Sequence, residues 1–202
     1  MLRLIRLDIP SELSAGRLVL RSLRSDDVPE LRAAVIDNLE HLRPFMPWIA
    51  DEPRPIADQY ALVERWDALR RPRTDWPVGI FVEGVLAGCA GLHQRRQPGA
   101  LEIGYWVRKA DTGRGIATVA SCLLTDLAFT AKRTKGVEIW HDRNNTRSRA
   151  VPRRLGFELI AEVAAGPAVR SPGDDGTDCR WRVTRDQWLE RRPSEASLVI
   201  AT

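Results

Sequence analysis

The sequence predicts a single mixed α/β (α+β) domain. Strand-like runs with a two-residue apolar period and helix-like segments with a three-to-four-residue period both occur along the chain. Seven segments have the length and composition of strands, and no internal repeat is present. With 202 residues, 44% of them hydrophobic and 29% charged, the chain is long enough to bury one substantial core. We therefore expect one domain over residues 1–202, which ends near Pro193 in a loose tail over 193–202.

The N-terminal half is expected to form one strand, two helices and a two-stranded hairpin. Residues 17–24 alternate apolar and polar side chains as a half-buried strand does, and Ser25 to Asp27 cap a helix that has Pro29 in its first turn. Four prolines between 41 and 55 exclude a regular element there. The expected elements are strand 17–24, helix 29–39, helix 56–70 with Ile56, Tyr60, Val63 and Leu69 on one face, and strands 76–83 and 86–93 joined by a tight turn at 83–85.

The C-terminal half is expected to contain four more strands and two more helices. The helix that begins at Ile116 has the clearest pattern, because its apolar residues recur at the spacing of a buried stripe. These residues are Ile116, Val119, Ala120, Leu123, Leu124, Leu127 and Ala131. The expected elements are strand 101–107, helix 116–132, strand 136–140, helix 146–155, and strands 157–163 and 179–184, with a flexible hairpin-like connection over 164–178.

The net charge of +4 and the pI of about 9.3 do not by themselves indicate a nucleic-acid partner. All but three of the 31 basic residues are arginines, and 27 acidic residues are interspersed among them. This pattern favours a solvated basic surface over a nucleic-acid-binding face, so we expect no direct nucleic-acid binding. The net positive charge is equally consistent with binding of a polyanionic coenzyme.

The three cysteines, Cys89, Cys122 and Cys179, are far apart, and no pair has metal-ligand or redox-motif spacing. We expect no metal site, and a reducing compartment is favoured over secretion. Residues 1–10 lack the apolar core of a signal peptide, and no apolar run approaches the ~18 residues that span a bilayer. The sequence thus predicts a soluble, cytoplasmic protein without a membrane partner.

A glycine-rich loop over 111–118 links the strand 101–107 to the long helix. Gly113 and Gly115 permit positive φ and close approach of a ligand to the backbone, and Ala117 keeps the first helical turn narrow. Such a junction presents free N–H groups at the positive end of a helix dipole, where phosphate binds. The spacing is neither that of the dinucleotide fingerprint nor that of a P-loop.

Several motifs occur together over about residues 13–190. They are Arg17-Leu18-Val19-Leu20-Arg21, His41-Leu42-Arg43-Pro44-Phe45-Met46-Pro47-Trp48, Glu102-Ile103-Gly104-Tyr105-Trp106-Val107, the loop Gly113-Arg114-Gly115-Ile116-Ala117-Thr118, and Asn145-Thr146-Arg147-Ser148 followed by Leu155-Gly156-Phe157. In this combination the chain resembles the GNAT superfamily of acyl-CoA-dependent N-acyltransferases, and within it the RimJ/RimL-type branch that acetylates ribosomal-protein N-termini. The resemblance implies the GNAT fold, with a central, mostly antiparallel twisted sheet of about seven strands flanked by helices on both faces. It also implies acetyl-CoA as co-substrate and no metal.

The family's pyrophosphate signature, Arg/Gln-x-x-Gly-x-Gly/Ala, is matched by Gly115 and Ala117. Thr112 stands where the arginine or glutamine is usual, and we expect its hydroxyl and the charge of Arg114 to replace that residue. By resemblance, the residues expected to contact the coenzyme are Val107, Arg108, Lys109, Thr112, Gly113, Arg114, Gly115, Ile116, Ala117, Thr118 and Asn145.

The reaction that the resemblance implies is direct attack of an amine on a thioester. A free α-amine, with a pKa of about 7.8, costs about 1 kcal/mol to deprotonate at pH 7, against about 4.6 kcal/mol for lysine. A modest base acting through water therefore suffices for an N-terminal amine. Glu102, in the strand beside the loop, is the candidate base, with His41 and His141 as rivals. A surface carboxylate paired with an arginine is the alternative interpretation of Glu102.

By resemblance, the backbone N–H of Val107 stabilises the oxyanion, Ser148 protonates the departing thiolate and Asn145 binds the pantetheine. From the sequence alone, a helix N-cap is the favoured interpretation of Asn145, and an ordinary first-turn residue that of Ser148. Pro152 cannot bond the carbonyl of Ser148, so we expect a kink or an early break in this helix and a free acceptor beside Ser148.

The amine acceptor is expected, by resemblance, to bind among Phe45, Met46, Trp48 and Trp66, near the turn over 93–98. An ordinary aromatic core is the alternative interpretation of these side chains. The leading hypothesis is acetyl transfer to a primary amine, either a protein N-terminus or a small molecule. Two alternatives stay open: another donor such as succinyl-CoA, and a non-catalytic CoA-binding or interaction protein. Relatives of this kind are monomers or homodimers, and the sequence does not choose between them.

Overall fold

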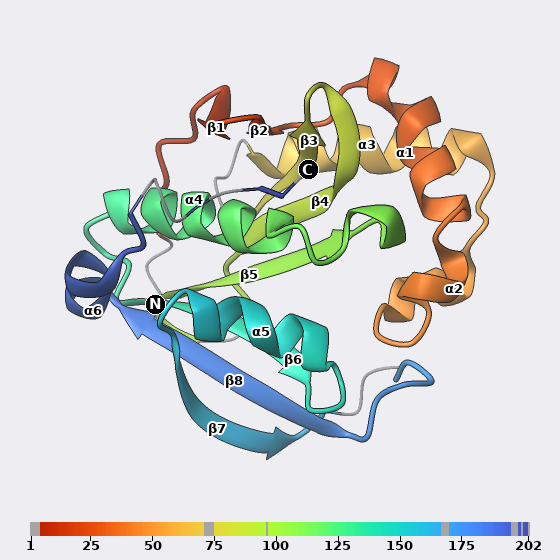
Figure 1. Ribbon diagram of the computed structural model, residues 1–202. Coiled ribbons are helices and arrows are strands. Elements are labelled where there is room, and N and C mark those ends of the chain that lie inside the picture. Colours follow the sequence, from red (N-terminus) through yellow and green to blue (C-terminus); the bar gives the residue numbers. More distant parts are fainter. Residues whose placement is uncertain are drawn as a thin grey trace.

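An open eight-stranded sheet lies at the centre of the fold, in the order β1-β2-β3-β4-β5-β6-β8-β7 (Figure 1). The computed structural model describes residues 5–70, 75–95, 97–166, 170–194, 198, 200 and 201. The strands are β1 (Glu12–Ala15), β2 (Leu18–Arg21), β3 (Asp75–Val82), β4 (Val85–His93), β5 (Ala100–Val107), β6 (Gly136–Asp142), β7 (Glu158–Ala164) and β8 (Thr177–Thr184). Every neighbouring pair is antiparallel except β5 and β6, which are parallel.

Helices cover both faces of this sheet. They are α1 (Val28–Ile36), α2 (Leu39–Leu42), α3 (Ile56–Arg70), α4 (Ile116–Thr130), α5 (Thr146–Arg154) and α6 (Arg185–Arg191), with 3-10 turns η1 (Ser25–Asp27), η2 (Pro47–Asp51) and η3 (Lys109–Asp111). One apolar cluster packs α4 against the sheet, and a second packs α1 and α3 against the opposite face. Because side chains alternate along a strand, β5 contributes Ile103 to the first cluster and Trp106 to the second. The predicted mixed fold, with helices on both faces of a mostly antiparallel sheet, is confirmed.

Each expected strand and helix is present with shifted limits, and the structure adds short elements that the sequence does not reveal. β1 supplies an eighth strand where about seven are expected. The second half of α2 and the whole of η2 lie in the segment 41–55, which is predicted to be irregular. Pro47 is tolerated because it opens a turn, where its missing N–H has no partner to lose. α6 begins with a capping box between Thr184 and Gln187.

The buried face of α3 differs from the expected one. Ile56 and Tyr60 are exposed, at 45% and 37% of their surface, although they are predicted to lie on the apolar face. At about 100° per residue they fall outside the arc that faces the sheet. The buried and half-buried residues within that arc are Gln59, Leu62, Val63, Trp66 and Leu69.

The C-terminal segment over 193–202 is predicted to be loose, whereas its described residues pack on the domain. Ile200 is buried in the main core cluster, and its carbonyl accepts a hydrogen bond from Arg17 (3.2 Å). The amide of Ala201 donates to the carbonyl of Arg114 in the glycine loop (3.0 Å). Burial of apolar residues therefore holds the described part of this segment beside the loop.

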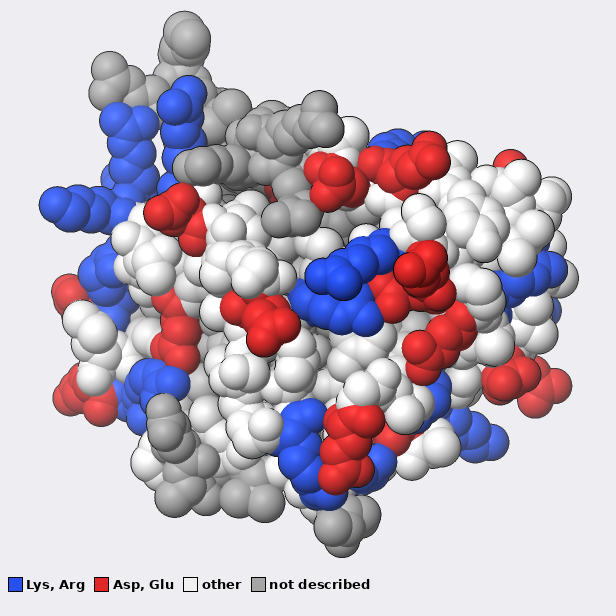
Figure 2. Space-filling model, turned by 90° about the horizontal axis from the view of Figure 1, so that it is seen from above, with Lys and Arg blue, Asp and Glu red and all other residues white. Residues whose placement is uncertain are grey.

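Basic and acidic side chains are interspersed over the middle of the face shown in Figure 2. Exposed ion pairs of the described chain include Arg17–Glu83 (3.0 Å). Within the described part of the chain, no helix combines the length and the hydropathy needed to cross a bilayer.

Candidate functional site

The parallel strands β5 and β6 separate part-way along the sheet. Their pairing ends at Ile103↔Ile139, although β5 continues to Val107 and β6 to Asp142. Two cavities open where the strands part. One, of about 460 Å³, reaches towards α1, α3 and the ends of β3 and β4, and we call it the aromatic cavity. The other, of about 790 Å³, follows α2, the glycine loop and the start of α5, and we call it the loop groove.

The two cavities share a wall. The residues that line both are Phe45, Met46, Tyr105, Trp106, Asn145 and Ser148. Two of them belong to β5 beyond its last pairing with β6, and two belong to the start of α5. A molecule in the loop groove and another in the aromatic cavity would therefore meet beside Tyr105 and Ser148.

The glycine loop leaves backbone amides open to the loop groove. Gly115 has φ +85° and precedes α4 in the left-handed conformation that other residues avoid. Within the described chain, the first amide of α4 that donates to the backbone is that of Val119, to the carbonyl of Gly115 (3.0 Å). Unpaired amides at the N-terminus of a helix form an anion site. The predicted loop residues that line the groove here are Thr112, Gly113, Gly115, Ile116, Ala117 and Thr118.

Arg114 does not line this groove. Its guanidinium pairs with Asp111 (2.6 Å) and donates to the carbonyl of Ala201 (2.8 Å). Arg108 pairs with the same carboxylate (2.5 Å), whose side chain is only 5% exposed. The Thr112 hydroxyl, which does line the groove, donates to the carbonyl of Lys109 (2.8 Å). The cations that line the groove are instead Lys109, Arg147 and Arg154, of which the last two belong to α5.

The end of β5 presents one backbone amide to the space where β5 and β6 separate, which we call the gap. The amide of Arg108 donates to the carbonyl of Ala87 (2.8 Å), which makes these two residues a hydrogen-bonded pair. Such pairs alternate with non-hydrogen-bonded pairs in an antiparallel ladder, and Val107, opposite Gly88, belongs to the second kind. The N–H of Val107 is therefore directed away from β4, towards the space that β6 has left.

Two other predicted coenzyme contacts have amides that are already paired. The amide of Arg108 is used in the ladder, and that of Lys109 donates to Oδ1 of Asn38 (2.7 Å). Asn38 is itself buried and donates to the carbonyl of Ala34 (2.8 Å), so this contact ties the end of β5 to α1. Sequence reasoning did not identify Asn38, because it lies 71 residues from its partner.

Ser148 lies against Tyr105. The tyrosine hydroxyl is 2.9 Å from the serine Oγ and 3.2 Å from the serine carbonyl, to which it donates. The predicted free carbonyl is thus present, because Pro152 has no N–H to offer it. Of the predicted kink or early break, the break does not occur, because α5 continues through Pro152 to Arg154. The tyrosine satisfies the freed carbonyl. Burial raises the pKa of Tyr105, so its hydroxyl keeps its proton at neutral pH.

Asn145 caps the same helix. Its Oδ1 accepts a hydrogen bond from the amide of Ser148 (3.1 Å). The N-cap interpretation is confirmed, and Asn145 also lines both cavities. A contact between Asn145 and a pantetheine arm stays a prediction.

The sequence profile described as acetyltransferase (GNAT) domain matches residues 17–158. The chain belongs to the GNAT acetyltransferase family. A protein of Bacillus subtilis (strain 168), provisionally named ribosomal N-acetyltransferase YdaF, is 32% identical over 143 residues, which are 69% of this chain and 77% of that protein. The predicted RimJ/RimL-type resemblance and the N-acyltransferase class, with acetyl-CoA as co-substrate, are confirmed at the level of the family.

Solved structures share the fold. One is the microcin C7 self-immunity acetyltransferase MccE in complex with acetyl-CoA and AMP, with a TM-score of 0.78 at 20% sequence identity. The match covers 87% of this chain and 97% of the MccE chain. Another is RimL, the ribosomal L7/L12 α-N-protein acetyltransferase in complex with coenzyme A, with a TM-score of 0.77 at 22% sequence identity. That match covers 87% of this chain and 99% of the RimL chain. The loop groove fits a GNAT co-substrate, since open amides and cations line it at one end and Val107 lies at the other.

The two histidines predicted as rival bases are both engaged. Trp181 donates its indole N–H to Nε2 of His141 (2.9 Å), so this nitrogen must be an acceptor, and Nδ1 donates to the carbonyl of Asp142 (2.8 Å). Burial lowers the pKa of His141, which is neutral and has no free nitrogen. Burial also lowers the pKa of His41, whose ring hydrogen-bonds the backbone of Val107 in the loop groove.

The predicted acceptor residues all line the aromatic cavity, whereas the predicted base does not. The lining residues include Phe45, Met46, Trp48 and Trp66. Glu102 lines neither cavity, and its role in this GNAT site stays a prediction. Of the predicted turn over 93–98, His93 and Arg95 line the cavity, and Arg96 lies outside the described residues.

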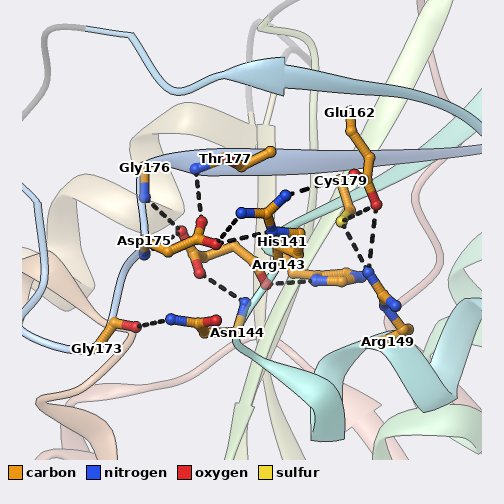
Figure 3. A network of polar contacts seen from close by, with 11 residues as sticks. His141, Arg143, Asn144, Arg149, Glu162, Gly173, Asp175, Gly176, Thr177 and Cys179 are labelled. Carbon is orange, nitrogen blue, oxygen red and sulfur yellow. Dashed lines mark hydrogen bonds and ion pairs between the residues drawn. The ribbon is translucent and has the colours of Figure 1, made fainter.

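A polar network holds the far wall of the gap, at the end of β6 (Figure 3). Asp142 Oδ2 accepts hydrogen bonds from the amides of Asp175 (3.0 Å) and Gly176 (3.2 Å), which fixes the turn before β8. Arg149 of α5 reaches Glu162 (3.4 Å) on β7 and the thiol of Cys179 (3.4 Å) on β8. The start of α5, which carries Ser148, is thereby anchored to the sheet. Among the described residues, no group of His, Cys, Asp and Glu is arranged to hold a metal ion.

Proposed function

We propose that this GNAT enzyme transfers an acetyl group from acetyl-CoA to the N-terminal α-amine of a cytoplasmic protein. The observation that carries the proposal is the wall shared by the two cavities, where a thioester and an amine can meet. The name of the Bacillus subtilis relative, a ribosomal N-acetyltransferase, supports a ribosomal protein as the acceptor.

The chain supplies a group for each need of this reaction. The open amides over 113–118 bind the diphosphate of the coenzyme, assisted by Lys109 and by the arginines of α5. The N–H of Val107 faces the carbonyl oxygen on which negative charge develops. The hydroxyl of Ser148, which lies 2.9 Å from that of Tyr105, turns its proton towards the departing sulfur and protonates it.

The aromatic cavity suits a flexible chain end. Its volume of about 460 Å³ admits one or two residues of an extended peptide, and a folded surface cannot enter. An α-amine is also easier to use than a lysine, because its deprotonation at pH 7 requires about 3.6 kcal/mol less. Both considerations favour a protein N-terminus over an internal lysine.

The test compares α-amines with lysine amines on matched peptides. Octapeptides that begin with Ser, Ala or Met are incubated with acetyl-CoA and the purified protein, beside the same peptides with a blocked N-terminus and an internal lysine. We expect thiol release only with the free N-termini, and a mass increase of one acetyl group on the first residue. Acetylation confined to lysine, or CoA binding without thiol release on any peptide, contradicts the proposal.

Replacing Ser148 with alanine is expected to lower kcat about 100-fold, because a general acid contributes about 10²- to 10⁴-fold to a rate. Tyr105→Phe removes the hydrogen bond to Ser148 and is expected to lower kcat about 10-fold. Thiol release measures kcat, and calorimetry with CoA checks that the coenzyme still binds. Because both residues act through one hydroxyl, the double variant should resemble Ser148→Ala alone. Additive losses would show that Tyr105 acts independently of Ser148.

A further inference from the structure

His93 and Asp75 form a hydrogen-bonded pair in the wall of the aromatic cavity. Nδ1 of His93 lies 2.7 Å from Oδ1 of Asp75, and the two side chains are 14% and 21% exposed. They stand opposite each other at the ends of β4 and β3. Both residues line the cavity, and neither is used by the chemistry described above.

The contact with Asp75 sets which nitrogen of His93 carries the proton. An ionised carboxylate can only accept, so Nδ1 of the neutral ring must be the donor. The other nitrogen, Nε2, then has an unshared electron pair. A carboxylate that orients an imidazole in this way leaves it able to accept a proton at Nε2.

The ring of His93 is directed back along β4 towards the gap. An ideal Cβ on Gly91 would lie 2.9 Å from Nε2, and one on Gly104 would lie 3.7 Å from it. These two glycines face each other across β4 and β5. The ring therefore lies over the two glycines, in space that larger side chains would occupy. Any larger residue at Gly91 would displace it.

We propose that His93 is the general base for the acceptor amine and that Asp75 is its positioning residue. This inference rests on the proposed acetyl transfer. Gly104 and Trp106 are two residues apart on β5, about 6.6 Å. One or two bridging waters can span a distance of this order between Nε2 and an amine beside Trp106. The ammonium group of the acceptor loses one proton through bridging water to Nε2, and the neutral nitrogen bonds to the acetyl carbon. The carbon–sulfur bond then breaks, the sulfur takes the hydroxyl proton of Ser148, and Ser148 regains a proton from the nitrogen that becomes the amide. His93 releases its proton to solvent.

Glu102 is less suited to this role than His93. It lies opposite His93 on β5, but it lines neither cavity, whereas His93 lines the aromatic cavity. Among the described residues, Arg95 lies beside this pair, with its Nε 3.7 Å from Asp75, and the Glu52–Arg54 ion pair lines the same cavity. The guanidinium of Arg95 lies on the Asp75 side of the pair, so it does not act as a charged neighbour of Nε2 of His93.

The test measures kcat/KM for acetylation of an octapeptide by His93→Gln, Asp75→Asn and Glu102→Gln proteins. For His93→Gln we expect a loss of about 100-fold at pH 7 with an unchanged Kd for CoA. The loss should shrink as the pH rises, because more of the acceptor amine is then neutral. It should nearly vanish with a peptide hydrazide whose α-amine is blocked, because its only nucleophilic nitrogen, that of the hydrazide, is neutral at pH 7. Asp75→Asn should lose about 10-fold, and Glu102→Gln should lose less than His93→Gln.

A second measurement needs no turnover. Nitrogen-15 spectra of the imidazole rings in the whole protein should show His93 with its proton on Nδ1, and Asp75→Asn should move that proton to Nε2. A proton on Nε2 in the unmodified protein, a wild-type rate for His93→Gln, or a larger loss for Glu102→Gln overturns the assignment of His93. A protein that binds CoA but acetylates no peptide or hydrazide overturns the proposed function instead, so the two failures are distinguishable.

Discussion

Gly115→Val is expected to weaken the binding of CoA at least about 100-fold. Gly115 has φ +85°, and the left-handed conformation costs other residues about 1–2 kcal/mol. A β-branched side chain there also stands in front of the open amides at the start of α4, where the diphosphate binds. Together these effects exceed the ~2.7 kcal/mol that corresponds to 100-fold in Kd. Calorimetric titration of the purified protein with CoA measures the change.

Gly84→Val is the matched control for this substitution. Gly84 has φ +82° in the turn between β3 and β4, and no atom lies within 4 Å of an added Cβ. The backbone strain is therefore similar, but the site is not part of the loop groove. We expect Gly84→Val to lower the melting temperature and leave the Kd for CoA unchanged. If Gly115→Val keeps its affinity while it is folded, the glycine loop does not bind the coenzyme.

The features that the sequence predicts well are local ones. The glycine loop, the buried stripe of α4 and the hairpin turn at Glu83-Gly84 each depend on residues close together in the chain. At the turn, Glu83 and Gly84 have φ +51° and +82°, as a two-residue hairpin requires. The free carbonyl of Ser148 was predictable for the same reason, because it follows from Pro152 within one helical turn.

The pair between Asp75 and His93 could not be predicted, because it depends on a β-bulge. Counting outwards from the hairpin turn puts Asp75 opposite Leu92. The structure shifts the register by one residue between Ile80 and Phe81, and Asp75 then faces His93. A shift of one residue also exchanges the two faces of the strand. No single-sequence pattern marks where such a shift occurs, so the pairing of Asp75 with His93 went unrecognised.

The position expected for the charge of Arg114 differs from the observed one for another reason. A sequence motif shows that Arg114 is present in the loop, but it does not show which way its side chain points. Asp111, three residues earlier, binds Arg114 within the loop, and the described tail residue Ala201 occupies its Nε. The arginines that line the groove, Arg147 and Arg154, come from α5, whose position depends on the separation of β5 and β6. Contacts between distant segments therefore decide the electrostatics of this site.

Glu138→Gln is expected to destabilise the protein by about 3–5 kcal/mol. The Glu138 side chain is 2% exposed and lies between Arg180 (2.6 Å) and Arg182 (3.1 Å) of β8. The amide is neutral, so two partly buried guanidinium groups lose the charge that balances them. For a chain of this length we expect the melting temperature to fall by roughly 10 °C.

Glu158→Gln separates this effect from the general loss of an ion pair. Glu158 pairs with Arg191 at 3.0 Å, a distance similar to those at Glu138, but both side chains are 49% exposed. Water screens such a pair, and its removal should change the free energy of unfolding by less than about 1 kcal/mol. Equal losses for the two variants would show that burial of Glu138 is not the cause.

Glu138 also accepts the indole N–H of Trp140 (2.9 Å), which lines the aromatic cavity. Folded Glu138→Gln should therefore show a raised KM for the acceptor peptide with an unchanged Kd for CoA, because the two cavities depend on different walls of the gap.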